Sequence, residues 1–440
     1  IHRVEDAQDA KARTQTFIDR FSAWYTPGVM VLALVAGLAS GDVVLALTLL
    51  VIGCPGALVI SIPVAIVAGI GRAARNGILI KGGEYLETSA KISAVAVDKT
   101  GTLTEGRPKL TDVVVLDPSL DRSDVLRWAA AAEAGSEHPL ARPILDTARA
   151  EGVGPDGIPG SVTPVPGKGI VSDVDGQRVL IGNPALLEQY GVVDHGGAAD
   201  TAGSLAAKGR TPMIVAVGDK VIGVVAVADQ IRADAPLMVA RLHEAGVDKV
   251  VMLTGDTRLV AEAIGAATGI DEIHASLLPE DKLDAVSALQ REGHTVAMVG
   301  DGVNDAPALA TANIGVAMGA AGSAVAVETA DIALMGDNLL KLPESISLAK
   351  RTVGVMRQNI AIALITVVLL LAGVFAGGVT MSIGMLVHEV SVLVVIGNAM
   401  RLLRNAGGST AMARSERIPA MTADAAGTRS LDTEPEGSRQ

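Results

Sequence analysis

The 440-residue chain has few of the residues that characterise several protein classes. Its one cysteine, Cys54, excludes intrachain disulfide bonds and multi-cysteine metal clusters. Its 36 basic residues are outnumbered by 48 acidic ones, and the net charge of −12 disfavours a nucleic-acid-binding protein. Aromatic residues make up 2% of the chain, so its cores must consist of Ala, Val, Leu and Ile. The chain begins with Ile1 and a charged stretch, so we expect a piece of a longer polypeptide.

Apolar residues, in contrast, are abundant. They make up 49% of the chain against 19% charged residues, and the mean hydropathy of +0.43 indicates a membrane-embedded part. A membrane-spanning helix needs about 20 mostly apolar residues. Four segments satisfy this requirement: 21–39, 43–70, 355–376 and 381–403. Only short turns separate the members of each pair, so we expect two transmembrane hairpins, and membrane lipid is a predicted partner.

The cations flanking these hairpins predict their orientation. They lie on the outer sides of both hairpins, whereas the two tight turns carry none; they are Arg72, Arg75, Lys81, Lys350, Arg351, Arg357, Arg401 and Arg404. By the positive-inside rule, the block of nearly three hundred residues between the hairpins is cytoplasmic. Buried helices of a large soluble protein are the alternative, but they would not distribute cations in this way. We therefore predict an integral, multi-pass protein of the plasma or inner membrane.

The block between the hairpins contains two different sequence patterns. From Val221 onward, β-rich runs (221–227, 250–253, 294–299 and 313–316) alternate with amphipathic helical stretches (233–245, 257–267, 280–291 and 305–311). This alternation predicts a parallel α/β sheet, to which the earlier run 92–97 adds one strand. Residues 112–219 interrupt the pattern with two helices and a hairpin that turns at Asp175-Gly176, so we predict an inserted α+β domain.

Short polar runs, each of which contains an aspartate, follow three of the predicted strands. They are Asp98-Lys99-Thr100, Thr254-Gly255-Asp256 and the run from Gly300 to Asp305. In a parallel α/β sheet, the functional side chains lie at the carboxyl ends of the strands. One carboxylate there can act as nucleophile toward a phosphoryl group while a second holds magnesium. Lys282, at the start of a helix, is a candidate to screen the phosphoryl oxygens.

The four strings that carry these residues resemble one family. DKTGTLTEG, TGD, PEDK and GDGVNDAPALA occur in that order and resemble the P-type ATPases. The resemblance implies a multidomain membrane protein with transmembrane α-helices, a cytoplasmic haloacid-dehalogenase-like, Rossmann-like phosphorylation domain and an inserted α+β nucleotide-binding domain. The implied parts are a linker (1–20), a transmembrane hairpin (21–70), the phosphorylation domain (71–111 and 220–340), the nucleotide-binding domain (112–219), a second hairpin (355–403) and a disordered tail (405–440).

The resemblance also implies the roles of individual residues. Asp98 takes the γ-phosphoryl group of ATP as an aspartyl phosphate, and Asp305 supports the loop. Magnesium is held by the Asp98 carboxylate, the Thr100 carbonyl and Asp301. The residues implied to contact the phosphoryl group or to belong to the matched motifs are Lys99, Thr254, Gly255, Asp256, Lys282 and Asn304. Asp229, Arg232 and Asp234 are implied to form the hinge by which the chain re-enters the phosphorylation domain.

The inserted domain resembles the nucleotide-binding domain of heavy-metal-transporting, type IB pumps. The residues that carry this resemblance are Ser136-Glu137-His138-Pro139, Gly167-Lys168-Gly169 and Gly182-Asn183. Glu137 and His138 can hydrogen-bond or stack against adenine, and the glycines let base and ribose lie against the backbone. Each signal alone is weak, since a histidine at a helix end is usually structural and Gly-x-Gly is usually a turn.

The membrane segments carry three candidate ligands for a transported transition-metal ion. Pro55 follows Cys54 and interrupts the helix, freeing carbonyls near Val51, while the last segment contains His388-Glu389. The family usually has a second cysteine or a similar variant pattern where this chain has Gly56. One thiolate, one imidazole and one carboxylate suit zinc, cadmium, cobalt or ferrous iron better than cuprous ion. The alternatives are a kinked packing helix and a His388–Glu389 pair that only stabilises packing.

One family feature is missing from the sequence. Pumps of this family carry an actuator domain with a Thr-Gly-Glu loop, and no Thr-Gly pair here is followed by Glu. We therefore expect an N-terminally truncated pump that lacks the actuator domain and the first membrane helices, with the missing part or a metallochaperone as a possible partner. Two other functions stay open: a membrane-anchored phosphatase of the haloacid-dehalogenase type and a catalytically silent binding partner.

Overall fold

The computed structural model describes residues 13–54, 56–136, 138, 140–154, 160–194, 197–301, 305–319 and 328–404. Most of the expected linker, the expected tail, and the candidate residues Pro55, Glu137 and Asn304 lie outside these ranges.

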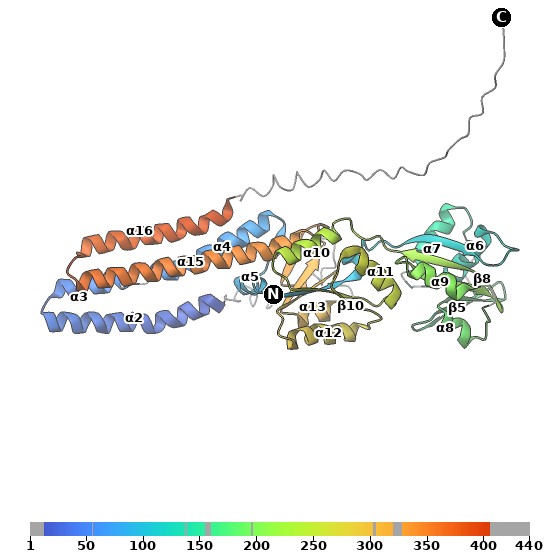
Figure 1. Ribbon diagram of the computed structural model, residues 1–440, viewed down its shortest axis with the longest axis horizontal. Coiled ribbons are helices and arrows are strands. Elements are labelled where there is room, and N and C mark those ends of the chain that lie inside the picture. The colour runs from blue at the N-terminus through green and yellow to red at the C-terminus, as the bar shows by residue number, and fades with distance from the viewer. Residues whose placement is uncertain are drawn as a thin grey trace, which may run out of the picture. The chain divides into compact units, whose positions relative to one another are not determined.

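The membrane-embedded part consists of five helices, labelled in Figure 1. They are α2 (Arg13–Ser40), α3 (Val43–Ile52), α4 (Gly56–Arg75), α15 (Lys341–Phe375) and α16 (Met381–Met400). Together they form four candidate spans, as predicted, because α3 and α4 belong to one interrupted span. Asp42 caps α3 by accepting hydrogen bonds from Val44 N and Leu45 N, which explains the tight turn after α2.

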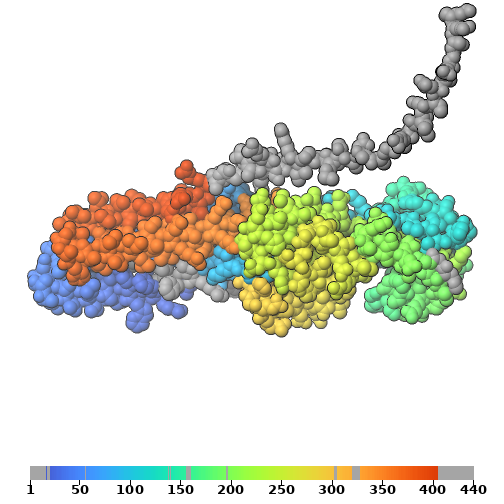
Figure 2. Space-filling view, in the orientation of Figure 1, coloured from blue at the N-terminus to red at the C-terminus, as the bar shows by residue number. Residues whose placement is uncertain are grey.

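The helices pack closely where small residues meet larger ones. A Cβ atom at Gly384 of α16 would lie 2.1 Å from Ile52 Cδ1, and one at Gly69 of α4 would lie 2.7 Å from Thr352 Oγ1. Side chains such as Leu369 and Leu393 are more than 60% exposed on the outer faces of α15 and α16, the orange-to-red elements of Figure 2. An apolar exterior over this length is suited to lipid contact.

A seven-stranded sheet forms the centre of the domain that the sequence predicts to be the phosphorylation domain. Its order is β1 (Ile78–Ile80), β13 (Ile332–Leu334), β12 (Ile314–Met318), β11 (Val296–Gly300), β2 (Ala94–Asp98), β9 (Lys249–Leu253) and β10 (Glu272–His274). All neighbouring pairs are parallel except β1 with β13. The strands predicted at 92–97, 250–253, 294–299 and 313–316 are confirmed as β2, β9, β11 and β12.

Helices cover both faces of this sheet. Val95 and Val97 of β2 pack into a core with α10 (Ala235–Glu244), α11 (Arg258–Thr268) and the first turns of α15. The alternate residues Ala94 and Ala96 pack into a second core with α12 (Pro279–Arg291) and α13 (Ala306–Thr311). Successive side chains of β2 thus point into the apolar layers on opposite faces of the sheet. Asp98 is the last residue of the strand.

A six-stranded antiparallel sheet forms the inserted domain. Its order is β3 (Lys109–Val115), β8 (Lys220–Ala228), β7 (Thr211–Val217), β6 (Gln177–Gly182), β5 (Gly169–Val174) and β4 (Ser161–Val165), accompanied by α6 (Arg122–Glu133), α7 (Ala141–Ala150), α8 (Pro184–Gln189) and α9 (Ala198–Ala206). The predicted hairpin at Asp175-Gly176 is confirmed: both residues have positive φ, and Val174 pairs with Gln177.

One strand assignment from the sequence is wrong. The run 221–227 was expected in the parallel sheet, but it is β8 and pairs with β3 and β7 in the antiparallel sheet. The inserted domain therefore extends from about Lys109 to Ala228, beyond the predicted 112–219. The run is almost uninterrupted in its apolar residues because β8 is buried on both faces, and such a run is equally compatible with either sheet.

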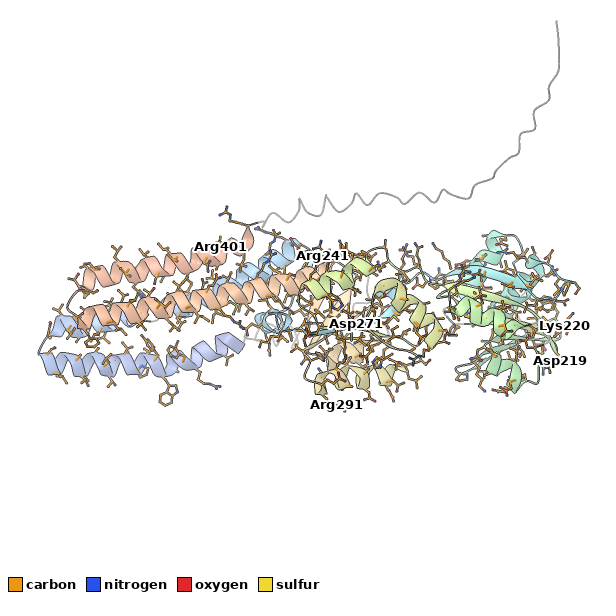
Figure 3. The ribbon with its side chains drawn as sticks, viewed as in Figure 1. Asp219, Lys220, Arg241, Asp271, Arg291 and Arg401 are labelled. Atoms are coloured by element: carbon orange, nitrogen blue, oxygen red, sulfur yellow. The ribbon has the colours of Figure 1, made fainter. Side chains whose placement is uncertain are left out.

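The charged side chains that are labelled in Figure 3 lie outside the membrane helices. Arg241 and Arg291 are labelled on α10 and α12, and Asp219 and Lys220 lie at the turn between β7 and β8. Arg401 lies just beyond the end of α16. The position of Arg401 agrees with the cation pattern from which the orientation of the hairpins was predicted.

Candidate active site

A buried cluster of opposite charges lies where the strands of the parallel sheet end. Asp98 closes β2, and its Oδ1 accepts a hydrogen bond from Lys282 Nζ at 2.6 Å. The same ammonium group donates to Asp305 Oδ1 at 2.7 Å. All three side chains are buried. Lys282 reaches the strand ends because Pro279 and the Asp281 side chain, which accepts from Leu278 N, start α12 beside them.

The cluster contains more negative than positive charge. Burial raises the pKa of Asp98 to about 6, and the Asp305 carboxylate acts in the same direction. Lys282 opposes this shift, and Asp301 adds to it. Burial lowers the pKa of Lys282, but the carboxylates of Asp98 and Asp305 outweigh burial, so that its pKa is raised and it remains charged. One ammonium group therefore bonds two carboxylates, and a third carboxylate, that of Asp301, acts on Asp98 as well.

Asp301 lies against the turn η1 (Lys99–Leu103) that follows Asp98. Gly101 has a φ of 73°, and a Cβ atom there would lie 2.8 Å from Asp301 Oδ2. Glycine is needed at this position both for the left-handed backbone and for the approach of the carboxylate. The contact brings the Asp98 turn and the end of β11 together, as expected for adjacent parallel strands.

The arrangement fits a magnesium ion held partly by substrate. Among the described residues, no group of three or more His, Cys, Asp or Glu side chains could hold a metal ion without other ligands. Magnesium, however, usually takes one or two carboxylates and completes its shell with water and substrate phosphates. Asp98 and Asp301 supply two carboxylates, and the uncompensated negative charge around them favours a divalent cation.

Lys99 links two strand ends. Its Nζ forms an ion pair with Asp256 Oδ2 at 2.6 Å, and its side chain is buried. Asp256 N in turn donates to Thr254 Oγ1, which orders the Thr254-Gly255-Asp256 turn after β9. The sequence assigned Lys99 only to a matched motif; in the structure it joins the Asp98 turn to the second predicted strand end.

The segments that connect the two domains are tied to each other. Asp229 accepts hydrogen bonds from Thr104 Oγ1, Gly106 N and Arg107 N, while Arg232 donates to the carbonyls of Gly101 and Thr104. Asp234 accepts from Leu339 N. Asp229 and Arg232 thus bind the chain segment that leaves the parallel-sheet domain to the segment that returns to it. Both segments lie beside the Asp98 turn, where the hinge is predicted.

A cavity of about 890 Å³ adjoins the inserted domain. This volume is in the usual range for a small-molecule site. Five residues predicted to contact nucleotide line it: His138, Gly167, Gly169, Gly182 and Asn183. Gly255 and Asp256, from the strand end that Lys99 contacts, also contribute to its lining.

Two of the three predicted glycines of this cavity are required by the sheet itself. A Cβ atom at Gly169 would lie 2.1 Å from Ile181 O, and one at Gly182 would lie 2.1 Å from Lys168 O. Gly169 and Gly182 are partners in the β5–β6 ladder, so close strand approach requires both of them. Gly167, in contrast, has no atom within 4 Å of an added Cβ and leaves its backbone open toward a ligand.

His138 and Asn183 are held in defined orientations. Leu140 N donates to His138 Nδ1, so the proton of the neutral ring lies on Nε2, which is available as a donor. Asn183 Nδ2 donates to Gly167 O, and its Oδ1 caps α8 by accepting from Leu186 N. Asn183 is therefore a support of the cavity wall as well as part of its lining.

Glu133 is a site residue that the sequence analysis missed. It lines the same cavity, it is 3% exposed, and its Oε2 has no hydrogen-bond partner among the described residues. Burial raises its pKa, against the effect of Ser136. One sequence signal could have indicated this position: an acidic residue lies on the otherwise alanine-rich buried face of α6, five residues before His138.

Comparison with known proteins agrees with this geometry. The haloacid dehalogenase-like hydrolase family matches residues 92–313. Over 92% of its length the chain is 41% identical to a probable cadmium-transporting ATPase of Staphylococcus aureus and 40% identical to a zinc-exporting P-type ATPase of Mycobacterium marinum. A crystal structure of a zinc-transporting PIB-type ATPase in the E2.Pi state superposes with a TM-score of 0.72 at 40% identity, covering 91% of this chain. The chain belongs to the type IB P-type ATPases.

This type IB ATPase chain spans 57% and 55% of the lengths of those two relatives and 66% of the solved zinc transporter. Its haloacid dehalogenase-like domain and its four candidate membrane spans agree with the architecture predicted from the motifs.

The three ligands predicted for the transported ion differ in their burial. His388 is buried within the helix bundle, whereas Cys54 and Glu389 are exposed. His388 and Ser391 share the inward face of α16, as their spacing predicts, and Ser391 Oγ donates to His388 O. The carbonyl expected to be free near Val51 accepts a 3.5 Å hydrogen bond from Cys54 N, because the chain makes one more turn after α3. In the described part of the chain, Cys54, His388 and Glu389 do not form one three-residue metal group.

Proposed function

We propose that this chain carries out the ATP-dependent, phosphoenzyme-forming part of the export of a divalent heavy-metal cation across a membrane. The Asp98–Lys282–Asp305 cluster beside a nucleotide-sized cavity is the observation that supports this proposal most strongly. ATP and Mg²⁺ are the proposed cosubstrate and cofactor. The overall reaction is ATP, water and metal inside giving ADP, phosphate and metal outside.

In the proposed reaction, an Asp98 carboxylate oxygen attacks the γ-phosphorus of ATP. The bond from the γ-phosphorus to the bridging oxygen breaks, ADP leaves, and an aspartyl phosphate remains. Lys282 holds the Asp98 carboxylate and neutralises negative charge near it, and Asp305 positions Lys282 through the second hydrogen bond. Asp98, Asp301 and the Thr100 carbonyl are the proposed magnesium ligands. Magnesium, when bound, supplies charge neutralisation at the transferring phosphoryl group.

We propose contacts for the nucleotide as well. Glu133 Oε2 is placed to accept from the exocyclic amine of adenine, because it is buried, unpartnered and in the cavity wall. His138 Nε2 donates to the same ligand, and the open Gly167 backbone lies beside it. Glu137 and Asn304 are motif-matched proposals that lie outside the described residues. Thr254, Gly255 and Asp256 are proposed to face the phosphates.

The proposed cargo is a divalent cation such as zinc, cadmium or cobalt. The relatives named above are described as cadmium-transporting and zinc-exporting, and a Mycobacterium tuberculosis relative, 39% identical, as manganese-exporting. The candidate ligands Cys54, His388 and Glu389 offer one thiolate, one imidazole and one carboxylate, a borderline set that suits these ions.

Incubation with γ-phosphate-labelled ATP and Mg²⁺ tests the phosphorylation step. We expect an acid-stable, protein-bound label that is absent from Asp98→Asn and present in Asp284→Asn, which changes an exposed carboxylate of α12. We also expect Glu133→Leu to weaken ATP binding while leaving the fold intact. Release of phosphate from small esters without labelled protein would instead indicate a phosphatase, and neither activity would indicate a binding partner.

A further inference from the structure

The arginines at the ends of the membrane helices differ in their partners from those of the other domains. Nine of the eleven arginines between residues 107 and 291 form ion pairs with carboxylates. Arg357 of α15 and Arg401 after α16 are both exposed, yet neither forms an ion pair with any residue that the structure describes. Residues 351–404 contain one carboxylate, that of Glu389, which lies about 18 Å along the helix from Arg401. The described part of the chain thus supplies no anion for these two guanidinium groups.

A network of side-chain amides connects the two arginines across the seam between α15 and α16. Arg401 Nη1 donates to Asn398 Oδ1 at 2.9 Å. Asn398 Nδ2 donates to Asn359 Oδ1 at 2.8 Å and to Gln358 Oε1 at 3.4 Å, and Gln358 is the neighbour of Arg357. Asn359 is fully buried, and its Nδ2 donates to a backbone carbonyl of α16 at 3.2 Å. The network therefore fixes the ends of both helices beside each other, with one arginine on either side of the seam.

Two donors of this cluster remain available to a ligand. The Arg401 guanidinium uses one nitrogen for Asn398, and the described residues make no hydrogen bond to the Gln358 amide nitrogen. There is also space: Gly397 lies about one turn before Arg401, and a Cβ atom added to it would meet no atom within 4 Å. The exposed surface changes from polar to apolar at this level. Leu393 of α16 and Ile365 of α15, each about two turns from the nearer arginine, are more than half exposed.

We propose that the α15–α16 seam binds the headgroup of an anionic phospholipid. Arg357 and Arg401 bind the phosphodiester, Gln358 donates to a headgroup oxygen, and the acyl chains lie along the exposed apolar faces of the two helices. Guanidinium groups bind phosphate oxygens in pairs, and basic sites between membrane helices on the cytoplasmic side suit anionic headgroups. A phospholipid matches both surfaces at once, because its charge and its hydrocarbon chains adjoin in the same way. The inference is independent of the proposed function, since it requires only that these helices span a membrane.

Native mass spectrometry of the full chain in detergent tests the proposal. Phosphatidylglycerol and phosphatidylcholine with the same acyl chains are the two probes. We expect the wild-type chain to retain phosphatidylglycerol in preference to phosphatidylcholine. Arg357→Gln and Arg401→Gln should each weaken the binding of phosphatidylglycerol about fivefold. Gly397→Leu should weaken it as well, because the new side chain fills the space beside Arg401.

Two matched variants control for charge and for bulk elsewhere in the membrane part. Arg20→Gln removes an exposed arginine at the start of the span formed by α2, and Gly28→Leu fills open space on the same helix. Both should retain phosphatidylglycerol as the wild-type chain does. Thermal unfolding without added lipid monitors the fold of every variant.

Four outcomes would overturn the proposal. The first is equal retention of the two lipids by the wild-type chain, and the second is equal weakening by Arg20→Gln and Arg401→Gln, which would indicate general surface charge. The third is protection against thermal unfolding by glycerol phosphate as strong as that by phosphatidylglycerol, which would indicate a soluble phosphate ligand. The fourth is a stable dimer that retains no phosphatidylglycerol, which would indicate that a second copy covers the seam.

Discussion

The carboxylates around Asp98 outnumber the one buried cation that they share. Lys282 bonds both Asp98 and Asp305, and Asp301 adds a further negative charge nearby. The pKa of Asp98 rises to about 6 because burial and these carboxylates disfavour its charged form more than Lys282 favours it. A carboxylate that is costly to ionise is the expected consequence of gathering several carboxylates in one buried cluster, and such a cluster favours the binding of a divalent cation.

Asp98→Asn is therefore expected to stabilise the metal-free chain at pH 7.5 more than at pH 5. The pKa of Asp98 is about 6 in the folded chain and 3.8 ordinarily, so its contribution to stability is complete below about 3.8 and is lost as the pH rises through about 6. Each pKa unit corresponds to about 1.4 kcal/mol, so the gain at pH 7.5 is on the order of 1–3 kcal/mol. Thermal unfolding at the two pH values measures it, and Asp284→Asn serves as the control. An equal effect of Asp98→Asn at both pH values would refute this explanation.

At the scale of helices and strands, the pairing of β5 with β6 shapes the cavity that adjoins the inserted domain. Gly169 and Gly182 face each other in the ladder, and neither position has room for a Cβ atom. Asn183, immediately after β6, then caps α8 and bonds the Gly167 carbonyl. The strand pair, the cap and the open Gly167 backbone form one continuous wall of the cavity.

Gly182→Ala is expected to lower the free energy of unfolding by about 1–3 kcal/mol and to weaken ATP binding. The added Cβ would lie 2.1 Å from Lys168 O, so β5 and β6 must separate. Gly203→Ala, in α9 with no atom within 4 Å of the added Cβ, should instead raise stability by about 0.5–1 kcal/mol. Chemical denaturation and nucleotide titration measure both effects. Similar stability changes for the two variants would contradict the strand-contact explanation.

Across the whole chain, α15 connects the domain of the parallel sheet with the candidate membrane spans. Leu342, Ile346 and Ala349 lie in the core of the parallel sheet, and the same helix continues to Phe375. Lys350 Nζ donates to Ala245 O at 2.5 Å and to Gly246 O at 3.4 Å, at the carboxyl end of α10. A cation at this end of a helix is favoured by the helix dipole. The sequence predicted only the apolar half of α15, from residue 355.

Lys350→Met should therefore reduce stability by about 0.5–2 kcal/mol, because the α10 carbonyls lose their cationic donor. Arg351→Met, at the exposed neighbouring position, should have little effect. Differential scanning calorimetry of the two variants in the same detergent makes this comparison. If both variants unfold at the same temperature, the Lys350 contact does not stabilise the attachment of α15 to the phosphorylation domain.

Local sequence patterns were sufficient to identify the four membrane segments, the alternating strands and helices, and the polar strand ends that contain Asp98, Asp256 and Asp301. Apolar runs and periodicities reflect the burial of neighbouring residues, and turn residues reflect local backbone conformation. The resemblance of the motifs to P-type ATPases then identified the family, which the relatives and the solved zinc transporter support.

Other features depended on contacts between distant segments. Lys282 lies 184 positions from the Asp98 that it contacts, and His388 comes from a different hairpin than Gly56. β8 pairs in the antiparallel sheet although its composition suits either sheet, and Glu133 is a cavity residue only because the chain folds around it. Periodicity reports that a residue is buried, whereas its partner depends on how the segments pack. For this reason the sequence predicted a chemical role for Asp98, and the tertiary structure established which side chains surround it.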